Sequence, residues 1–222
     1  MRRKHALRRA GRGGARRAAG LTAGVAALAG LLWTAPAVAQ EGTEIRHAPQ
    51  QKAVGSQVEI VDELPVIRPE FPVPDEPNML FYLQRSTNPN TIVYAAQFRE
   101  DGRLDPREPV VAYWRRFNTT GERKPLKMME DAFAFGVRAQ ATGDPDVFDL
   151  YVVSYPERKA TVRLVEPGRA ELVLQSGRHA MRPLYAYVDV DESGLVPSVR
   201  KVVVLGRDAE TGKALVERIQ IE

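Results

Sequence analysis

The sequence predicts a mainly β domain, an antiparallel sandwich or barrel that carries one α-helix. From residue 78 onward, short runs of residues alternate between apolar and polar side chains with a period of two. Turn-forming residues, chiefly Gly, Asn, Asp and Pro, separate most of these runs. A single segment breaks the alternation with apolar residues at helical spacing. Many short strands with frequent turns are typical of sandwiches and barrels.

The N-terminal segment has the features of a Sec-type signal peptide. Its first 17 residues carry eight Lys and Arg and no acidic residue, and an apolar run follows from Leu21 to Trp33. Ala37 and Ala39 then provide the small residues that a signal peptidase recognises. We therefore expect a signal peptide over residues 1–39, cleavage after Ala39 and a periplasmic or secreted protein. An uncleaved anchor is the alternative, and no stable membrane span is expected after cleavage because the apolar run is short.

Most of the apparent basicity belongs to this signal. The chain has 32 Lys and Arg against 28 Asp and Glu, and eight of the basic residues precede residue 40, so the mature chain would be slightly acidic, at about −4. Nucleic-acid binding needs a clustered basic surface, so no nucleic-acid partner is expected. The chain contains no Cys, which excludes disulfides and thiol chemistry.

Residues 40–77 are predicted to be a Pro-rich linker without regular structure. Six prolines interrupt it: Pro49, Pro65, Pro69, Pro72, Pro74 and Pro77. Such a segment tends to be extended and stiff. Within it, Val58–Val61 could form a short edge strand.

The β domain is expected over residues 78–222. Leu80–Arg85 and Thr91–Phe98 form a predicted hairpin around an Asn/Pro turn, and Val110–Phe117 is the third strand. The remaining predicted strands are Val147–Tyr155, Thr161–Val165, Ala170–Leu174, Leu184–Val190, Val199–Leu205 and Ala214–Ile221.

The predicted helix spans Pro125–Phe135. Leu126, Met129 and Phe133 recur at helical spacing, Pro125 suits the first turn and Gly136 suits the exit. We expect about three turns that lie on a sheet face or plug a barrel end.

The hairpin sequence also resembles a known family. Residues 78–94, NMLFYLQRSTNPNTIVY, are similar to the opening of an uncharacterised, mostly bacterial family of exported proteins, domain of unknown function 4833 (DUF4833). Pro109–Trp114 and the helix end Ala134–Val137 fit the same resemblance. It would cover about residues 78–220, and it implies no reaction.

One candidate site lies at the end of the hairpin. Polar residues gather there, among them Arg85, Ser86, Asn88 and Asn90. Asn and Ser side chains often bond their own backbone and fix a turn, so a structural role is one interpretation. In the other, these residues form a polar cradle in which Arg85 holds an anionic group.

A second candidate lies on the third strand. Alternation places Tyr113 and Arg115 on one face with Val111 and Phe117, so Arg115 shares a side with large apolar groups. A buried Arg needs a partner, whereas an Arg at an edge can reach solvent. The functional interpretation is a pocket with aromatic walls and one cation, which would suit a small amphipathic or acidic ligand.

No motif selects a reaction. Carboxylates occur at Glu130, Asp131, Asp144, Asp146 and Asp149, but their spacing indicates turn chemistry rather than a metal site. A Ser–His–Asp triad could use only His179, and no nucleophile elbow, phosphate loop or dinucleotide motif is present after residue 39. No catalytic residue, cofactor or metal is therefore predicted.

The sequence favours a non-catalytic, ligand-binding β domain whose predicted ligand residues are Arg85, Ser86, Asn88, Asn90, Tyr113 and Arg115. The expected partner is a small molecule or an envelope protein. The second hypothesis is a structural or envelope-interaction module whose partner pairs with an exposed sheet edge. The third is a hydrolase-type enzyme without Cys or His chemistry.

Overall fold

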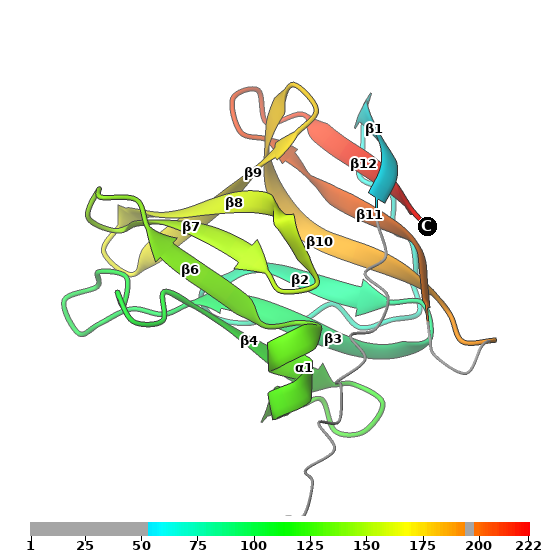
Figure 1. Ribbon diagram of the computed structural model, residues 1–222, viewed down its shortest axis with the longest axis horizontal. Coiled ribbons are helices and arrows are strands. Elements are labelled where there is room, and N and C mark those ends of the chain that lie inside the picture. Colours follow the sequence, from blue (N-terminus) through cyan, green and yellow to red (C-terminus); the bar gives the residue numbers. More distant parts are fainter. Residues whose placement is uncertain (1–52, 194–197) are drawn as a thin grey trace, which may run out of the picture. The chain divides into compact units, whose positions relative to one another are not determined.

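A computed structural model describes residues 53–193 and 198–222. The predicted signal peptide, and residues 40–52 of the predicted linker, lie outside these ranges. The described chain is mainly β, as the sequence predicted, with a single short helix (Figure 1). Its strands are β1 (Ala53–Val61), β2 (Met79–Arg85), β3 (Asn88–Ala96), β4 (Val110–Arg116), β5 (Glu122–Pro125), β6 (Val137–Ala141), β7 (Val147–Val152), β8 (Tyr155–Glu166), β9 (Arg169–Ser176), β10 (His179–Asp191), β11 (Ser198–Asp208) and β12 (Ala214–Ile221).

Strand β10 is the centre of one branched sheet. Along one edge it pairs with β11, which continues to β12 and β1. Its other edge is divided between two strands: His179–Met181 pair with β9, and Tyr185–Val188 pair with β2 in the one parallel pairing among the described strands. Two branches therefore leave β10, one running β2-β3-β4-β5 and the other β9-β8-β7-β6.

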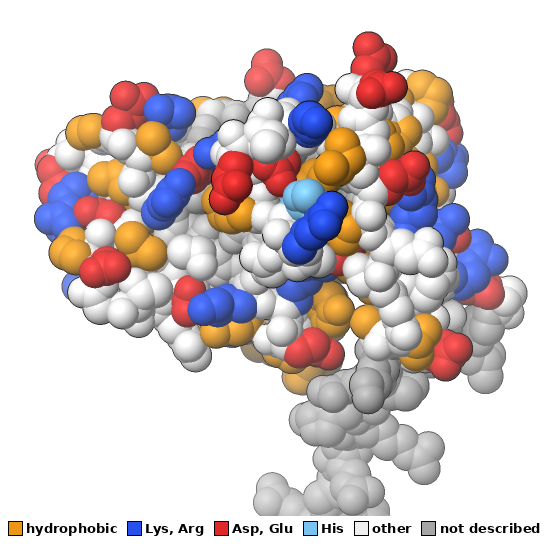
Figure 2. Space-filling model, turned by 90° about the horizontal axis from the view of Figure 1, so that it is seen from above, with side chains coloured by type: hydrophobic (Ala, Val, Ile, Leu, Met, Phe, Trp, Pro, Cys, Tyr) orange, Lys and Arg blue, Asp and Glu red, His pale blue; other side chains and the backbone are white. Residues whose placement is uncertain are grey.

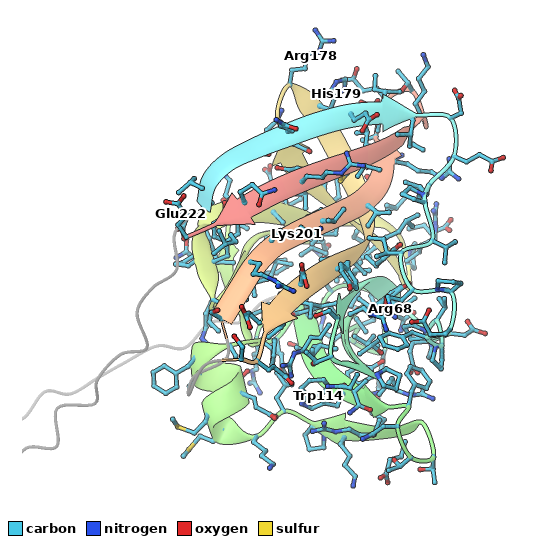
Figure 3. All side chains as sticks on the ribbon, turned by 90° about the vertical axis from the view of Figure 1, so that its right-hand side faces the viewer. Arg68, Trp114, Arg178, His179, Lys201 and Glu222 are labelled. Carbon is cyan, nitrogen blue, oxygen red and sulfur yellow. The ribbon has the colours of Figure 1, made fainter. Side chains whose placement is uncertain are left out.

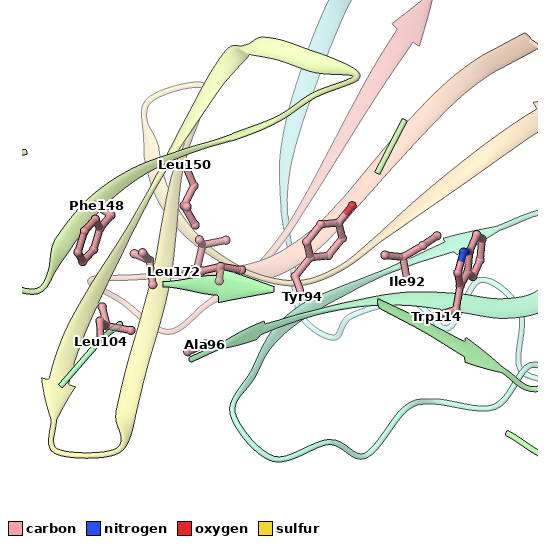
Figure 4. Packing of buried hydrophobic residues seen from close by; sticks show 10 residues of the cluster. Ile92, Tyr94, Ala96, Leu104, Trp114, Phe148, Leu150 and Leu172 are labelled. Carbon is pink, nitrogen blue, oxygen red and sulfur yellow. The ribbon is translucent and has the colours of Figure 1, made fainter. Parts of the chain in front are cut away.

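The main hydrophobic core fills the space between these two branches (Figure 4). Alternate side chains of β3 and β4 point inward and meet side chains from β7, β8 and β9, as a period of two requires. Tyr94 is fully buried there; its ring stacks on Phe81 and its hydroxyl donates a hydrogen bond to the carbonyl of Phe135 at 3.0 Å. The curled sheet is thus a half-barrel, with β4 and β6 approaching each other at its open side.

The helix is shorter and more exposed than the sequence predicted. Helix α1 spans Met128–Phe133, and Pro125 ends β5 instead of starting the helix. Met128, Met129 and Phe133 are 81%, 60% and 52% exposed, so this part of the predicted apolar stripe does not cover a sheet face, whereas Leu126 and Phe135, at the two ends of the predicted segment, pack on the main core. Helical spacing identified the helix but could not tell which way it faces. No described helix is long and apolar enough to cross a membrane.

Residues 53–77 differ from the linker expected over residues 40–77. Strand β1 pairs along its length with β12, and the Pro-rich segment over residues 62–78, here called the strap, lies on the outer face of the sheet. Leu64 and Ile67 of the strap pack on a buried cluster of β10, β11 and β12, and Pro74 is buried. Prolines prevent regular pairing but not apolar packing, which explains the difference.

A buried polar network ties β1 to the rest of the sheet. Glu217 of β12 is only 3% exposed, and its carboxylate accepts hydrogen bonds from Ser56 of β1 at 2.6 Å, Ser176 of β9 at 2.7 Å and Arg158 of β8 at 2.9 Å. Burial acts to raise the pKa of Glu217, but the hydrogen bonds from Arg158, Ser176 and Ser56 outweigh it and hold the pKa below its usual value.

Candidate functional site

Tyr113 and Arg115 share the outer face of β4, as the alternation predicted. Tyr113 is buried in an outer cluster with Tyr82 and Val93, whereas Trp114, between them, points into the main core. The hydroxyl of Tyr113 donates to Glu76 Oε2 at 3.1 Å, and Arg115 forms an ion pair with the same carboxylate. The partner that a half-buried Arg requires is therefore a carboxylate of the chain itself.

Glu76 reaches this position because the strap is held along the sheet. Tyr185 donates its hydroxyl to the carbonyl of Pro65 at 2.9 Å, and Arg68 donates to the carbonyl of Ser86 at 3.2 Å. Figure 3, which looks onto the right-hand side of the molecule as drawn in Figure 1, labels Arg68. Arg115 also donates from Nε to the carbonyl of Gly121 at 2.6 Å. The cation that we predicted for an external ligand thus holds Glu76.

Asn88 and Asn90 fix the turn geometry at this end of the sheet. The side-chain oxygen of Asn88 accepts the backbone N–H of Asn90 at 3.1 Å, and that of Asn90 accepts the backbone N–H of Asn118 at 3.1 Å. The buried side chain of Asn90 therefore links the β2–β3 hairpin to the turn that follows β4. These contacts match the structural interpretation of the hairpin cluster.

Arg85 and Ser86 connect the hairpin to β10. Arg85 pairs with Glu192 at 3.3 Å. Ser86 donates its N–H to the carbonyl of Val188 at 2.9 Å, and its hydroxyl accepts the N–H of Val190 at 2.9 Å. Arg85 and Arg115 therefore hold two different carboxylates, and neither residue lines either of the two hollows described below.

The larger of two hollows in the described part of the chain is a groove of about 1060 Å³ on the open side of the half-barrel. One wall is β4 from Val110 to Tyr113, and the other is β6 from Val137 to Ala139. The loop before β4, strand β5 and helix α1 contribute further residues. Its volume slightly exceeds the range usual for small-molecule sites. We call it the β4–β6 groove.

Charge in the β4–β6 groove is dominated by arginine. Arg107, Arg123 and Arg138 line it together with the acidic Glu108 and Asp131. Asp131 pairs with Arg138 at 3.2 Å, whereas Glu108 keeps its charge and accepts a hydrogen bond from the neutral amide of Gln97 at 2.9 Å, so three cations and two anions give the lining a net charge of +1. Among the described residues, no carboxylate lies within ion-pair distance of the other two arginines.

Tyr113 joins the two regions, since it lines the groove as well as contacting Glu76. The guanidinium of Arg123 lies 3.7 Å from the centre of the Tyr113 ring, a cation–π distance. Burial raises the pKa of Tyr113, so its hydroxyl stays protonated and remains a donor at neutral pH. Sequence reasoning singled out Tyr113 but missed the arginines, which lie on separate elements and share no spacing.

His179 and the acidic residues form no catalytic or metal centre within the described ranges. His179 Nδ1 lies 2.9 Å from Asp208 Oδ2, but the only described contact of Nε2 is Arg178, and the nearby Ser176 hydroxyl bonds Glu217. Hydrogen bonds from the backbone of Thr211 and from His179 hold the pKa of Asp208 at about 2. No group of three potential metal ligands occurs among the residues that the structure describes.

A second hollow of about 360 Å³ lies on the outer face of β8, β9 and β10. Its two arginines, Arg163 and Arg182, share the carboxylate of Glu171, and Glu210 also lines the hollow, so neither arginine lacks an ion-pair partner. On the face shown in Figure 2, basic and acidic side chains are interspersed without a patch of one sign. The β4–β6 groove, with two unmatched cations, is therefore the stronger candidate.

Comparison with known proteins gives one match. A family model described as domain of unknown function DUF4833 matches residues 81–218. No curated protein and no solved structure matches the chain.

Proposed function

Because the chain belongs to the DUF4833 family, whose description names no activity, we propose its function from its own geometry: a non-catalytic binding domain that holds an anionic ligand in the β4–β6 groove. The proposal includes export, with the signal peptide over residues 1–39 removed and the domain working in the periplasm or outside the cell.

The observation that carries the proposal is a pair of exposed arginines, without a carboxylate partner among the described residues, on the lining of the larger of the two hollows. Arg107 and Arg123 line the groove without a carboxylate partner in the described part of the chain. Arg favours carboxylates and other planar anions, which it binds with two parallel hydrogen bonds. The apolar surface of Val111, Ala112 and Pro125 beside these cations suits an amphipathic ligand.

Two other functions have less support. The ligand role predicted for Arg85, Ser86, Asn88 and Asn90 stays a prediction, because in the structure these side chains bond the chain itself. A hydrolase would need a positioned nucleophile and base, and the described residues offer only the His179–Asp208 pair without a nucleophile at the second ring nitrogen. The interaction-module hypothesis shares the groove and is developed below.

The test is a thermal-shift screen of the full-length chain against small mono- and dicarboxylates and short acidic oligomers. A ligand present at a hundred times its dissociation constant should stabilise the protein by about 2.7 kcal/mol. The shift should disappear in Arg123→Ala and persist in Arg178→Ala, which removes an exposed Arg at the other end of the molecule from Trp114 and β4 (Figure 3). If no anion shifts the melting temperature, or if both variants behave alike, the proposal fails.

A further inference from the structure

We propose that the occupant of the β4–β6 groove is an extended acidic polypeptide segment, added as a strand to the free edge of β6. This inference rests on the proposed function, because it names the ligand class of the same groove. It is carried by the direction of the backbone groups on the two strands that wall the groove.

The free edge of β6 presents its backbone to the groove at every second residue. Val153 donates to the carbonyl of Gly136, and Thr142 donates to the carbonyl of Val147, which fixes the even-numbered residues as the ones bonded to β7. The N–H and C=O groups of Val137, Ala139 and Ala141 therefore point away from β7, and of these the Val137 carbonyl accepts a hydrogen bond from the Arg138 side chain at 2.8 Å. In the described part of the chain, β6 has no other partner strand.

Strand β4 presents its own free groups from the opposite wall. Gln97 donates to the carbonyl of Pro109, so the residues bonded to β3 are the odd-numbered ones from there on. Ala112 consequently directs its N–H and C=O toward the groove, because β5 pairs only with the later part of β4, from Tyr113 onward. Two open strand edges thus face the same hollow.

Open edges of this kind match strand addition better than a compact ligand. A small anion could neutralise Arg107 and Arg123 but would leave most of these backbone groups to water. An added strand satisfies them with main-chain hydrogen bonds, while its alternate side chains supply specificity. Exposed strand edges are otherwise a hazard for aggregation, which natural proteins cover.

The charge of the groove selects an acidic segment. Arg107 and Arg123 have no ion-pair partner among the described residues and the lining is net positive by one charge, so an acidic strand gains two partners, whereas a Lys- or Arg-rich strand would find only Glu108. Beside Asp131, helix α1 exposes Met128, Met129 and Phe133, a flexible apolar surface of the kind that accepts varied partners. The expected sequence therefore alternates Asp or Glu with apolar residues.

The experiment selects peptides from a phage-displayed library of random octapeptides on the full-length chain. Recovered peptides are synthesised and their affinities are compared between the natural chain, Ala139→Pro and Ala139→Val. Proline removes the N–H that faces the groove without removing a β6–β7 hydrogen bond, and edge strands tolerate it. Valine is the matched control, since it alters the side chain and keeps the donor.

We expect acidic, alternating peptides that bind the natural chain and Ala139→Val alike. Ala139→Pro should weaken them by about tenfold or more, given the lost hydrogen bond and the displaced strand. A second measurement uses only the natural chain, so it does not depend on the folding of the variant. Methylating the backbone nitrogens of alternate residues should abolish binding for one parity and change it less for the other.

Each remaining outcome overturns the inference in a different way. Peptides that bind Ala139→Pro equally and tolerate both methylation patterns, but are weakened by Arg123→Ala, would refute strand addition and leave the binding groove in place. Failure to recover any peptide would refute strand addition, with the groove judged separately by the carboxylate screen. A homodimer that Ala139→Pro dissociates, seen by sedimentation, would replace the acidic partner with a second copy.

Discussion

Replacing Glu217 tests whether the buried network holds β1 on the sheet. The carboxylate sits among Ser56, Ser176 and Arg158, whose side chains come from β1, β9 and β8. The Glu217→Ala change removes the acceptor for all three and leaves the guanidinium of Arg158, only 17% exposed, without its charge partner.

The expected cost follows from the degree of burial. Removing one partner of a buried ion pair costs about 3–5 kcal/mol, because the remaining charge stays desolvated. Glu217→Gln keeps an oxygen acceptor of the same shape, so we expect a smaller loss of about 1–3 kcal/mol. The matched control is Glu59→Ala, which breaks the exposed ion pair with Arg218 across the same two strands and should cost about 1 kcal/mol or less.

Urea unfolding followed by circular dichroism measures these differences. The urea concentration at the transition midpoint should be lowest for Glu217→Ala, higher for Glu217→Gln and highest for Glu59→Ala. A Glu217→Ala loss no larger than that of Glu59→Ala would refute the view that this network anchors β1.

The same network predicts a pH dependence. The pKa of Glu217 is lowered in the folded state, so its contribution is complete above the unfolded pKa of about 4.3 and is lost as pH falls through the lower folded value. The stability gap between the natural chain and Glu217→Gln should therefore be constant near neutral pH and shrink below about pH 4. A gap that widens on acidification would contradict this sign.

Three further results are expected. Gly206→Ala should destabilise the fold by about 1–3 kcal/mol in thermal melts, because the added Cβ would lie 2.4 Å from a backbone carbonyl of β10, whereas Gly55→Ala, with no atom within 4 Å, should be nearly neutral. Asp208, with a pKa of about 2, should contribute stability that is present above about pH 4 and lost as pH falls through about 2; a carboxyl NMR midpoint near 4 would contradict this. Glu76→Gln should weaken the hold of Arg115 on the strap and speed proteolysis within residues 62–77 by about tenfold; unchanged cleavage would show that apolar packing alone secures the strap.

Periodicity predicted the faces of β4 correctly. Tyr113 and Trp114 are neighbours in sequence, and the structure places them in two different clusters on opposite sides of the strand, as a period of two requires. The same reasoning placed Arg115 beside large apolar groups and left open whether it reaches solvent at an edge or is buried with a partner. Local sequence therefore predicted the strand and the orientation of its faces, but it did not identify the group that contacts Arg115.

The partner of Arg115 is Glu76, which lies 39 residues earlier in the chain and could not be predicted from the local sequence. Glu76 belongs to a Pro-rich segment whose composition is the same whether it is a free linker or a docked strap. Docking depends on contacts with distant parts of the chain, among them the apolar packing of Leu64 and Ile67 on strands near the C-terminal end. Long-range partners of this kind leave no periodic signal.

The groove was unpredictable for a different reason. Which backbone groups of β6 are free depends on its register with β7, and a shift of one residue would exchange Val137 and Ala139 for their neighbours. Arg107, Arg123 and Arg138 converge only after two branches of the sheet have curled toward each other. Strand identity was available from the sequence, whereas register and curvature were not.

The branching at β10 has a consequence for how fast the chain can fold. Both branches start from this strand, and β2 joins it only when residues about a hundred positions apart meet. The Glu59–Arg218 contact between β1 and β12 closes an interval of 159 residues. Bringing such distant segments together costs chain entropy before their contacts stabilise the fold. The domain should therefore fold slowly, on the millisecond-to-second scale or longer. Until β10 is available, hairpins such as β2–β3 and β7–β8 can form, but no pairing among the described strands connects the two branches of the sheet.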